Sequence, residues 1–492
     1  MFGISKKIAV FLVLICASAF ILRVWGLNRD LLFHRDQGLH SLEIYKIWHD
    51  HKISLLGHTS DVDGLTHSPV YFWIMTPIYA VTNGSPVAAS VFQIFLEVAS
   101  LPFLFFAINY FLGKRTAILT LMLYTFSYGM ISQSRWLSNV TPILPSSNIL
   151  LYLLAIQSKK IKAIHIFYTS LLIGLITQFN AAVGVFLIPF LFWFYRKNLK
   201  LTNILLIFIG LTLPAAPLII FQFRHDFVNV KAIWNYLTAS KDGVGFSILV
   251  FWNNLKILVK QITLSVFYPL ALVACGLFLL GIAKIWHNKN RNLIYSFILI
   301  PFVFLGLFQR GAISFFFDAM LGVCIAICLY GLEFFPKKLG LIIFSLILIL
   351  NLNNLPQVYK PTNALIPIGD ANVITIRDRK NVIDWIYKKA GGKPFSIWYY
   401  TIPFYQNEAW DYLFLTYGQP KYGYLPEMTH GFSPNDLKTS KYFFDVYEPE
   451  WDLGRVDKQT AWFSNVDTNF GKVVDSSSSH DVIVQLRSWN NK

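Results

Sequence analysis

The feature that most constrains this chain is a series of long apolar runs, which recur from residue 7 to residue 353. Several of them approach or exceed the roughly 18 apolar residues that mark a membrane-spanning helix. Hydrophobic residues make up 55% of the 492 residues and charged residues only 14%, and the mean hydropathy is +0.50. This composition excludes an ordinary soluble enzyme. We therefore predict an all-α polytopic membrane domain.

The distribution of lysine and arginine sets the number of spans, because short cytoplasmic loops are enriched in both. With a cytoplasmic N-terminus and about eleven spans, every basic loop falls on the inner side. The segment Pro69–Thr82 is short and contains Pro77, so we predict an interfacial or re-entrant helix instead of a twelfth span. The predicted spans are 7–25, 87–111, 116–134, 139–157, 163–179, 181–195, 202–221, 263–283, 293–309, 314–333 and 339–353.

Other sequence features narrow the class further. The first apolar run continues to Leu22, beyond a typical signal sequence, and predicts a retained helix. All four cysteines lie in apolar segments, so no disulfide framework is expected. The net charge of +16 is concentrated in the short loops, which indicates membrane orientation and no nucleic-acid partner.

The tail from Asn354 onward has a different character, with more charges, prolines and asparagines. We predict a helix over 377–390 that stops at Gly391-Gly392, a strand over 395–400 and a helix over 408–415. Residues 472–486 predict two strands around a turn at 476–479. The chain therefore divides into a membrane domain (1–353) and an extracytoplasmic mixed α/β domain (354–492).

The first external loop, residues 34–86, concentrates polar residues between apolar segments. Its residues 34–67 hold five acids and six histidines. Polar groups beside a bilayer usually mark a substrate path or an active site. We predict a membrane-surface helix from about Gln37 to Asp50, with Asp36 at its N-cap. This carboxylate either only caps the helix or serves as a rigidly held base.

Metal binding in this loop has two candidate donor sets. The histidines match no strong zinc pattern, so solvated or interfacial imidazoles are the preferred interpretation. Asp61 and Asp63 could offer oxygen ligands to Mg²⁺ or Mn²⁺, whereas the sequence DVDG also suits a turn.

Several motifs in this order resemble the GT-C glycosyltransferases, in particular bacterial relatives of protein O-mannosyltransferases and lipid A aminoarabinose transferases. The first-loop motifs are Asp36-Gln37-Gly38 and His67-Ser68-Pro69-Val70-Tyr71-Phe72. Further along, the similar elements are 134–139 around Arg135, 174–180 with Gln178 and Asn180, and 221–227 with Arg224 and His225. Asn180 stands where the family element has His.

The resemblance implies inverting transfer of a hexose, mannose-like, from a polyprenyl-phosphate donor to a cell-surface acceptor. Asp36 would be the base that deprotonates the acceptor hydroxyl. Four basic residues would bind the donor phosphate. Four polar residues would shape the substrate-binding site. The basic residues are Arg224, His225, Arg310 and Arg135, and the polar ones are His67, Tyr71, Gln178 and Asn180.

Two alternatives from other classes stay open. A transporter or flippase of lipid-linked sugars would also be polytopic, but we expect charged residues within its spans, and here charges are expected at span ends. A non-catalytic membrane scaffold is the other alternative, favoured by Asn180 and by Phe315–Phe317, where the family has a tyrosine-rich element.

Overall fold

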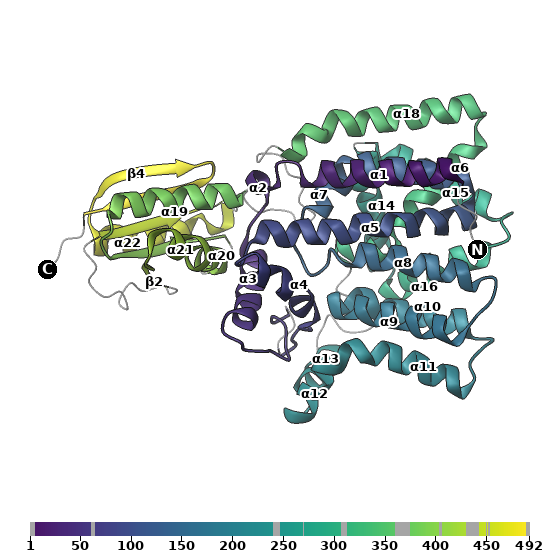
Figure 1. The fold of residues 1–492 in the computed structure, drawn as a ribbon, viewed down its shortest axis with the longest axis horizontal. Helices are drawn as coiled ribbons and strands as arrows, with labels where there is room; N and C mark the ends of the chain where they lie inside the picture. The colour runs from purple at the N-terminus through teal and green to yellow at the C-terminus, as the bar shows by residue number, and fades with distance from the viewer. Residues whose placement is uncertain are drawn as a thin grey trace.

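A helical bundle and a C-terminal α/β region lie side by side in the computed structural model (Figure 1). The structure describes residues 5–60, 64–239, 247–268, 270–306, 312–359, 374–402, 406–429, 442–448, 450 and 453–488. Within these residues, five helices are long and apolar enough to cross a membrane, or six if one bent pair counts as a span. Five shorter apolar helices of 10–17 residues accompany them. The architecture is that of a multi-pass membrane protein, and the count of eleven spans remains a prediction.

Most of the apolar runs form helices close to the predicted bounds. The bundle helices are α1 (Lys6–Val24), α5 (Pro86–Leu112), α6 (Lys114–Phe126), α7 (Tyr128–Ser134), α8 (Ile143–Gln157), α9 (Ala163–Phe179), α10 (Ala181–Tyr195), α11 (Leu201–Thr212), α12 (Ala216–Arg224), α13 (Val228–Ala239), α14 (Ile248–Ile262), α15 (Ala271–Ile285), α16 (Arg291–Gly306), α17 (Asp318–Gly331) and α18 (Lys337–Asn354). Short 3-10 turns lie at 213–215, 314–317, 332–334 and 355–359, and a π-helical turn lies at 263–267.

Two features of the bundle were not predicted. The span 116–134 is broken into α6 and α7, because Ser127 is extended and its hydroxyl caps the Met130 amide. The segment between the predicted spans 202–221 and 263–283 contains α13 and α14. Helix α14 is amphipathic, with Asn254 and Gln261 buried and Ile248 exposed.

Helix α17 lies at the centre of the bundle. Its most apolar window is 89% buried, compared with 22% for α1, for the α11–α12 segment and for α18. These peripheral helices expose apolar side chains such as Val13, Leu205 and Leu346. Such a surface suits contact with lipid acyl chains.

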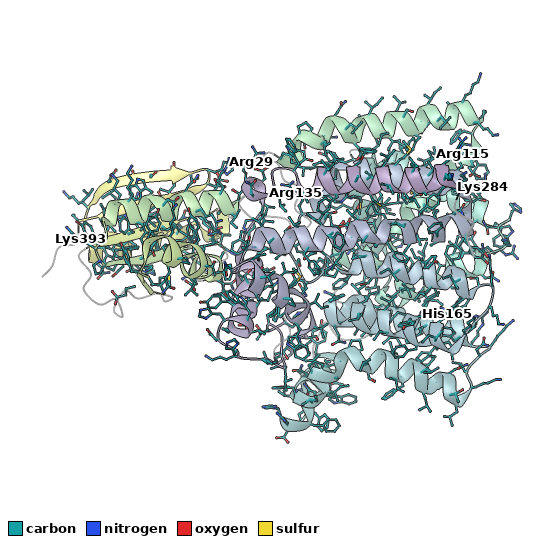
Figure 2. All side chains as sticks on the ribbon, viewed as in Figure 1. Arg29, Arg115, Arg135, His165, Lys284 and Lys393 are labelled. Carbon is teal, nitrogen blue, oxygen red and sulfur yellow. The ribbon has the colours of Figure 1, made fainter. Side chains whose placement is uncertain are left out.

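The basic loops gather at the end of the bundle that is far from the C-terminal region. Figure 2 shows Arg115, Lys284 and His165 at that far end, whereas Arg29 and Arg135 lie beside the C-terminal region. The Lys284 ammonium pairs with Glu333 at 2.8 Å. We refer to the opposite end, next to the C-terminal region, as the domain-side end. The predicted basic loops thus share one side, although their orientation in a membrane remains a prediction.

Three helices connect the bundle to the C-terminal region. Helix α2 (Leu27–Asp30) continues from α1 after Gly26, which adopts the left-handed conformation with a φ of 69°. Helices α3 (Arg35–Trp48) and α4 (Val70–Val81) follow, both at the domain-side end (Figure 1). Helix α4 matches the predicted short helix at 69–82.

The C-terminal region is a five-stranded mixed sheet with the strand order β2-β1-β3-β5-β4. Its strands are β1 (Phe395–Tyr400), β2 (Glu427–Thr429), β3 (Tyr442–Tyr447), β4 (Val473–Ser479) and β5 (Val482–Arg487). Strand β1 runs parallel to β2 and β3, and β5 is antiparallel to β3 and β4. The turn between β4 and β5 lies at His480-Asp481, so the predicted turn at 476–479 was wrong, because those four serines continue strand β4.

Helices cover both faces of this sheet. They are α19 (Ile376–Ala390), α20 (Glu408–Leu413), α21 (Gln419–Tyr422) and α22 (Val456–Phe470), with a π-helical turn at 414–418 and a 3-10 turn at 453–455. Helix α19 ends at Gly391, which has φ 58° as a left-handed C-cap requires. Alternation along β1 directs Trp398 and Tyr400 to the cluster with Trp462 of α22, and directs Ile397 and Tyr399 to the core shared with the bundle.

Candidate functional site

The predicted base, Asp36, lies in the first turn of α3 at the domain-side end. The N-cap residue is His34, so the prediction that Asp36 itself caps the helix was wrong. The reason is that Gln37 closes the helix start, where its side-chain oxygen accepts a hydrogen bond from the His34 amide at 3.0 Å. The Asp36 side chain is 49% exposed. A carboxylate at this position is stabilised by the helix dipole and is accessible to a substrate.

A cation adjoins Asp36, and the sequence analysis missed it. Arg35 Nη1 lies 3.7 Å from Asp36 Oδ1. Arg35 Nε lies 3.9 Å from Glu408 Oε1 of α20. The guanidinium therefore lies between two carboxylates, one from each part of the protein. Arg35 could have been suspected from its place beside Asp36, whereas nothing in the sequence places Glu408 near either residue.

Three of the first-loop histidines form a stack. The ring centroids of His40 and His58 are 4.8 Å apart, and those of His58 and His67 are 4.3 Å apart. His40 is only 4% exposed and packs against Tyr71 and Phe72. Burial lowers the pKa of His58 to about 3 and holds the pKa of His40 well below its usual range. His40 and His58 are therefore neutral at physiological pH.

This stack is not a preformed metal site. In the described part of the chain, no group of three or more His, Cys, Asp or Glu side chains could hold a metal ion. The planes of His58 and His67 differ by 28°, so the rings face each other and do not converge on one point. The other predicted metal ligands, Asp61 and Asp63, lie outside the described residues.

Tyr71 belongs to a hydrogen-bond network that holds the junction after α7. Its hydroxyl donates to Gln93 Oε1 at 3.3 Å, and Gln93 Nε2 donates to the Trp136 carbonyl at 3.1 Å. Gln37 Nε2 donates to the Leu137 carbonyl at 3.1 Å. The junction is thus fixed from both α3 and α5.

Gln178 and Asn180 lie where α9 turns into α10. The Asn180 side chain accepts a hydrogen bond from the Val183 amide at 3.3 Å and caps α10. Gln178 is buried, and its amide nitrogen donates to the Gly174 carbonyl at 3.3 Å. These contacts give Asn180 a capping role that needs no titratable group.

Arg135 is buried at the domain-side end, where Figure 2 shows it beside the C-terminal region. It donates to the carbonyls of Trp25 at 2.7 Å and Arg23 at 3.2 Å. Its Nη2 lies 3.9 Å from Asp30 Oδ2, and its guanidinium lies 5.2 Å from the Tyr359 ring centroid. These contacts join the end of α1 to α7.

Arg224 and His225 lie at the exposed end of α12. His225 stacks on Phe221, with ring centroids 3.9 Å apart. The start of α13 is tied to the first loop, because Asn229 Nδ2 donates to Thr66 Oγ1 at 2.9 Å. The loop and the α12–α13 corner are therefore neighbours. Arg310 lies outside the described residues.

Buried charges inside the bundle were also missed. Arg23 and Glu97 are fully buried and 3.6 Å apart, and Glu97 accepts hydrogen bonds from Ser134 at 2.8 Å and Tyr124 at 3.1 Å. Glu97 lies well inside α5, so the expectation that charges occur only at span ends was wrong. An acid within an apolar run is the signal that could have revealed it.

Comparisons with known proteins identify the fold. No protein-family model matches the sequence, and no curated protein matches it. Among solved structures, ArnT from Cupriavidus metallidurans in the apo state matches with a TM-score of 0.58 at 12% identity, over 98% of both chains. The same protein bound to undecaprenyl phosphate matches with a TM-score of 0.56, also at 12% identity, over 97% of this chain and 98% of that one.

A more distant solved structure points the same way. Arabinofuranosyltransferase AftD from Mycobacteria matches with a TM-score of 0.51 at 11% identity, over all of this chain but only 42% of AftD. All three structures belong to GT-C glycosyltransferases. The resemblance found in the sequence is therefore confirmed at the level of the fold, which includes both the bundle and the C-terminal region.

Proposed function

We propose that this protein is a GT-C membrane glycosyltransferase that moves a hexose, mannose-like, from a polyprenyl-phosphate donor to a cell-surface acceptor. The observation that carries the proposal is the half-exposed Asp36 carboxylate in the first turn of α3, with Arg35 beside it. The match to ArnT bound to undecaprenyl phosphate, over nearly the full length of both chains, supports a lipid-phosphate donor.

The chemistry needs one base and a site for one anion. Asp36 takes the proton from the acceptor hydroxyl, and the acceptor oxygen then attacks the anomeric carbon of the donor sugar. The bond between that carbon and the phosphate oxygen breaks with its electron pair, and polyprenyl phosphate leaves. Attack opposite the leaving group inverts the anomeric centre. The leaving phosphate is already stable as an anion, so cations suffice and no general acid is required.

Arg224, His225 and Arg310 are the proposed phosphate ligands, because they lie at or near the ends of apolar segments. Arg135 is the weakest of the four candidates, since its guanidinium already binds two backbone carbonyls. The four polar residues proposed to shape the substrate-binding site are His67, Tyr71, Gln178 and Asn180. We further propose a plasma-membrane location, with the N-terminus cytoplasmic and the C-terminal region extracytoplasmic.

Sugar transfer in reconstituted membranes tests this function. Purified protein in liposomes would receive radiolabelled polyprenyl-phosphate hexoses and a cell-envelope extract as acceptor. The proposal expects labelled acceptor and released polyprenyl phosphate in equal amounts. Asp50→Asn is the matched control for Asp36→Asn, because Asp50 is another carboxylate of the same loop and bonds only its neighbour His49 in the contacts described.

Transport of lipid-linked sugars is the alternative that one observation favours, namely the buried Arg23–Glu97 pair within the bundle. A transporter would move the labelled lipid across the bilayer intact. The labelled lipid would then become protected from an added hydrolase while its sugar–phosphate bond stays intact. This result would favour transport and reject the transferase.

A further inference from the structure

The C-terminal region holds the chain immediately before α3. Residues 31–33 pair with residues 374–376 in a short antiparallel bridge. The Ile376 amide donates to the Leu31 carbonyl at 2.8 Å, and the Phe33 amide donates to the Ile374 carbonyl at 3.3 Å. The start of α3 is therefore attached to a segment more than three hundred residues away, as well as to the bundle.

Arg379 of α19 secures the other side of Phe33. Its Nε donates to the Phe33 carbonyl at 2.8 Å. Its Nη2 pairs with Glu448 Oε1 at 2.9 Å, and the two side chains are only 3% and 2% exposed. The guanidinium also lies 4.6 Å from the centroid of the Trp410 ring. A buried, charge-assisted hydrogen bond of this kind fixes the acceptor carbonyl tightly.

Glu448 is itself fixed within the C-terminal region. Its Oε2 accepts a hydrogen bond from the Ile402 amide at 3.1 Å, and its Oε1 accepts one from Trp410 Nε1 at 3.4 Å. The position of Arg379 is thus set by the sheet region and cannot follow α3 if the helix moves.

Helix α20 contacts α3 directly. The backbone at Glu408 and Ala409 approaches Gly38 so closely that a Cβ there would overlap it. The Tyr412 hydroxyl donates to the Gly84 carbonyl at 2.5 Å, and its ring lies 5.9 Å from that of Phe33. Helix α3 is therefore held between the bundle and the C-terminal region.

We propose that Arg379 is a positioning residue for the transfer reaction. Through the Phe33 carbonyl it fixes the first turn of α3, and so the direction of the Asp36 carboxylate three residues later. The catalytic part of this inference rests on the proposed function. The C-terminal region then acts as a part of the active-site framework, besides any role in binding the acceptor.

Amide hydrogen exchange in α3 tests the physical part without any activity assay. The Gly38 amide donates to the His34 carbonyl at 2.9 Å, which is the first hydrogen bond of the helix. In Arg379→Gln we expect this amide to exchange at least about tenfold faster, because the helix start opens more often. Lys388→Gln is the matched control, an exposed basic residue on the same helix, and should leave the exchange unchanged.

Kinetics test the catalytic part. We expect kcat to fall by about 10- to 100-fold in Arg379→Gln, the scale expected for a misplaced catalytic group, while the KM values for both substrates stay within about twofold. Arg379→Lys, which keeps one donor and the charge, should recover part of kcat. Glu448→Gln is the second variant if Arg379→Gln does not fold, and it should show the same pattern more weakly.

The outcomes separate the two proposals. Unchanged exchange at Gly38 in a folded Arg379 or Glu448 variant overturns the positioning role. Faster exchange with an unchanged kcat also overturns it. Absence of transfer by the wild-type protein overturns the proposed function, while faster exchange in the variant would still establish the mechanical link between Arg379 and α3.

Discussion

Replacing Gly38 by alanine should disrupt the contact between α3 and the C-terminal region. A Cβ at this position would lie within 3.0 Å of three backbone atoms of Glu408 and Ala409. Backbone atoms cannot rotate away, so α20 or α3 must shift by about an ångström, at a cost of roughly 1–3 kcal/mol for overpacking. Alanine would stabilise the helix itself by only about 1 kcal/mol relative to glycine. The net effect should therefore be destabilising.

The consequence for activity should exceed the consequence for stability. A shift of about 1 Å in the helix that carries Asp36 is expected to cost about 100-fold in turnover. Thermal unfolding in detergent and kcat would be measured together. Gly276→Ala is the matched control, because Gly276 lies within helix α15 and its added Cβ would meet no atom within 4 Å outside the adjoining backbone of that helix. Full activity and unchanged stability in Gly38→Ala would refute the reasoning.

Three further predictions concern stability and pH. Arg23→Met should lower the unfolding free energy by about 3–5 kcal/mol, because Glu97 would keep a buried charge without its partner. Part of this stability, measured by thermal unfolding, should return in the double variant Arg23→Met/Glu97→Leu. Burial lowers the pKa of His58 to about 3 and holds the pKa of His40 well below its usual range, so these histidines take up protons in the unfolded chain first as the pH falls below about 6.5. The unfolding free energy should therefore fall by about 1.4 kcal/mol per pH unit between pH 6.5 and 4 through His58, and further through His40, and a variant with glutamine at both positions should flatten this dependence. Asn180→Ala should lower the unfolding free energy by about 1 kcal/mol through the lost cap of α10. The pH profile of transfer should not change, and a shifted profile would indicate an acid/base role at this position.

The membrane helices could be predicted from sequence because their ends coincide with strong local signals. Helix α1 begins beside Lys6, and α5 begins at Pro86 after the capping Ser85. Helix α14 was missed because its buried polar residues have partners that only the fold provides. Asn254, for example, donates to the Leu305 carbonyl and accepts from the Ala312 amide.

The candidate site also has one part that the sequence predicted and one part that it did not. Asp36 stood out because it lies in the polar first loop at the start of a predicted surface helix, and the structure places it in the first turn of that helix. The contacts of its neighbours were not predictable, because Glu408 meets Arg35, and Arg379 meets the Phe33 carbonyl, through tertiary packing of distant segments. Periodicity and motif order carry no information on such pairs.

The central claim is that Asp36 is the base of a polyprenyl-phosphate-dependent transfer. The most direct test measures donor binding and sugar transfer side by side for the wild type and Asp36→Asn. The substitution keeps the size of the side chain and removes its negative charge and its basicity. We predict unchanged donor affinity with transfer reduced by at least about 100-fold, the usual scale for a lost general base. Transfer within a few-fold of wild type would contradict the account and leave Asp36 a residue of the helix start alone.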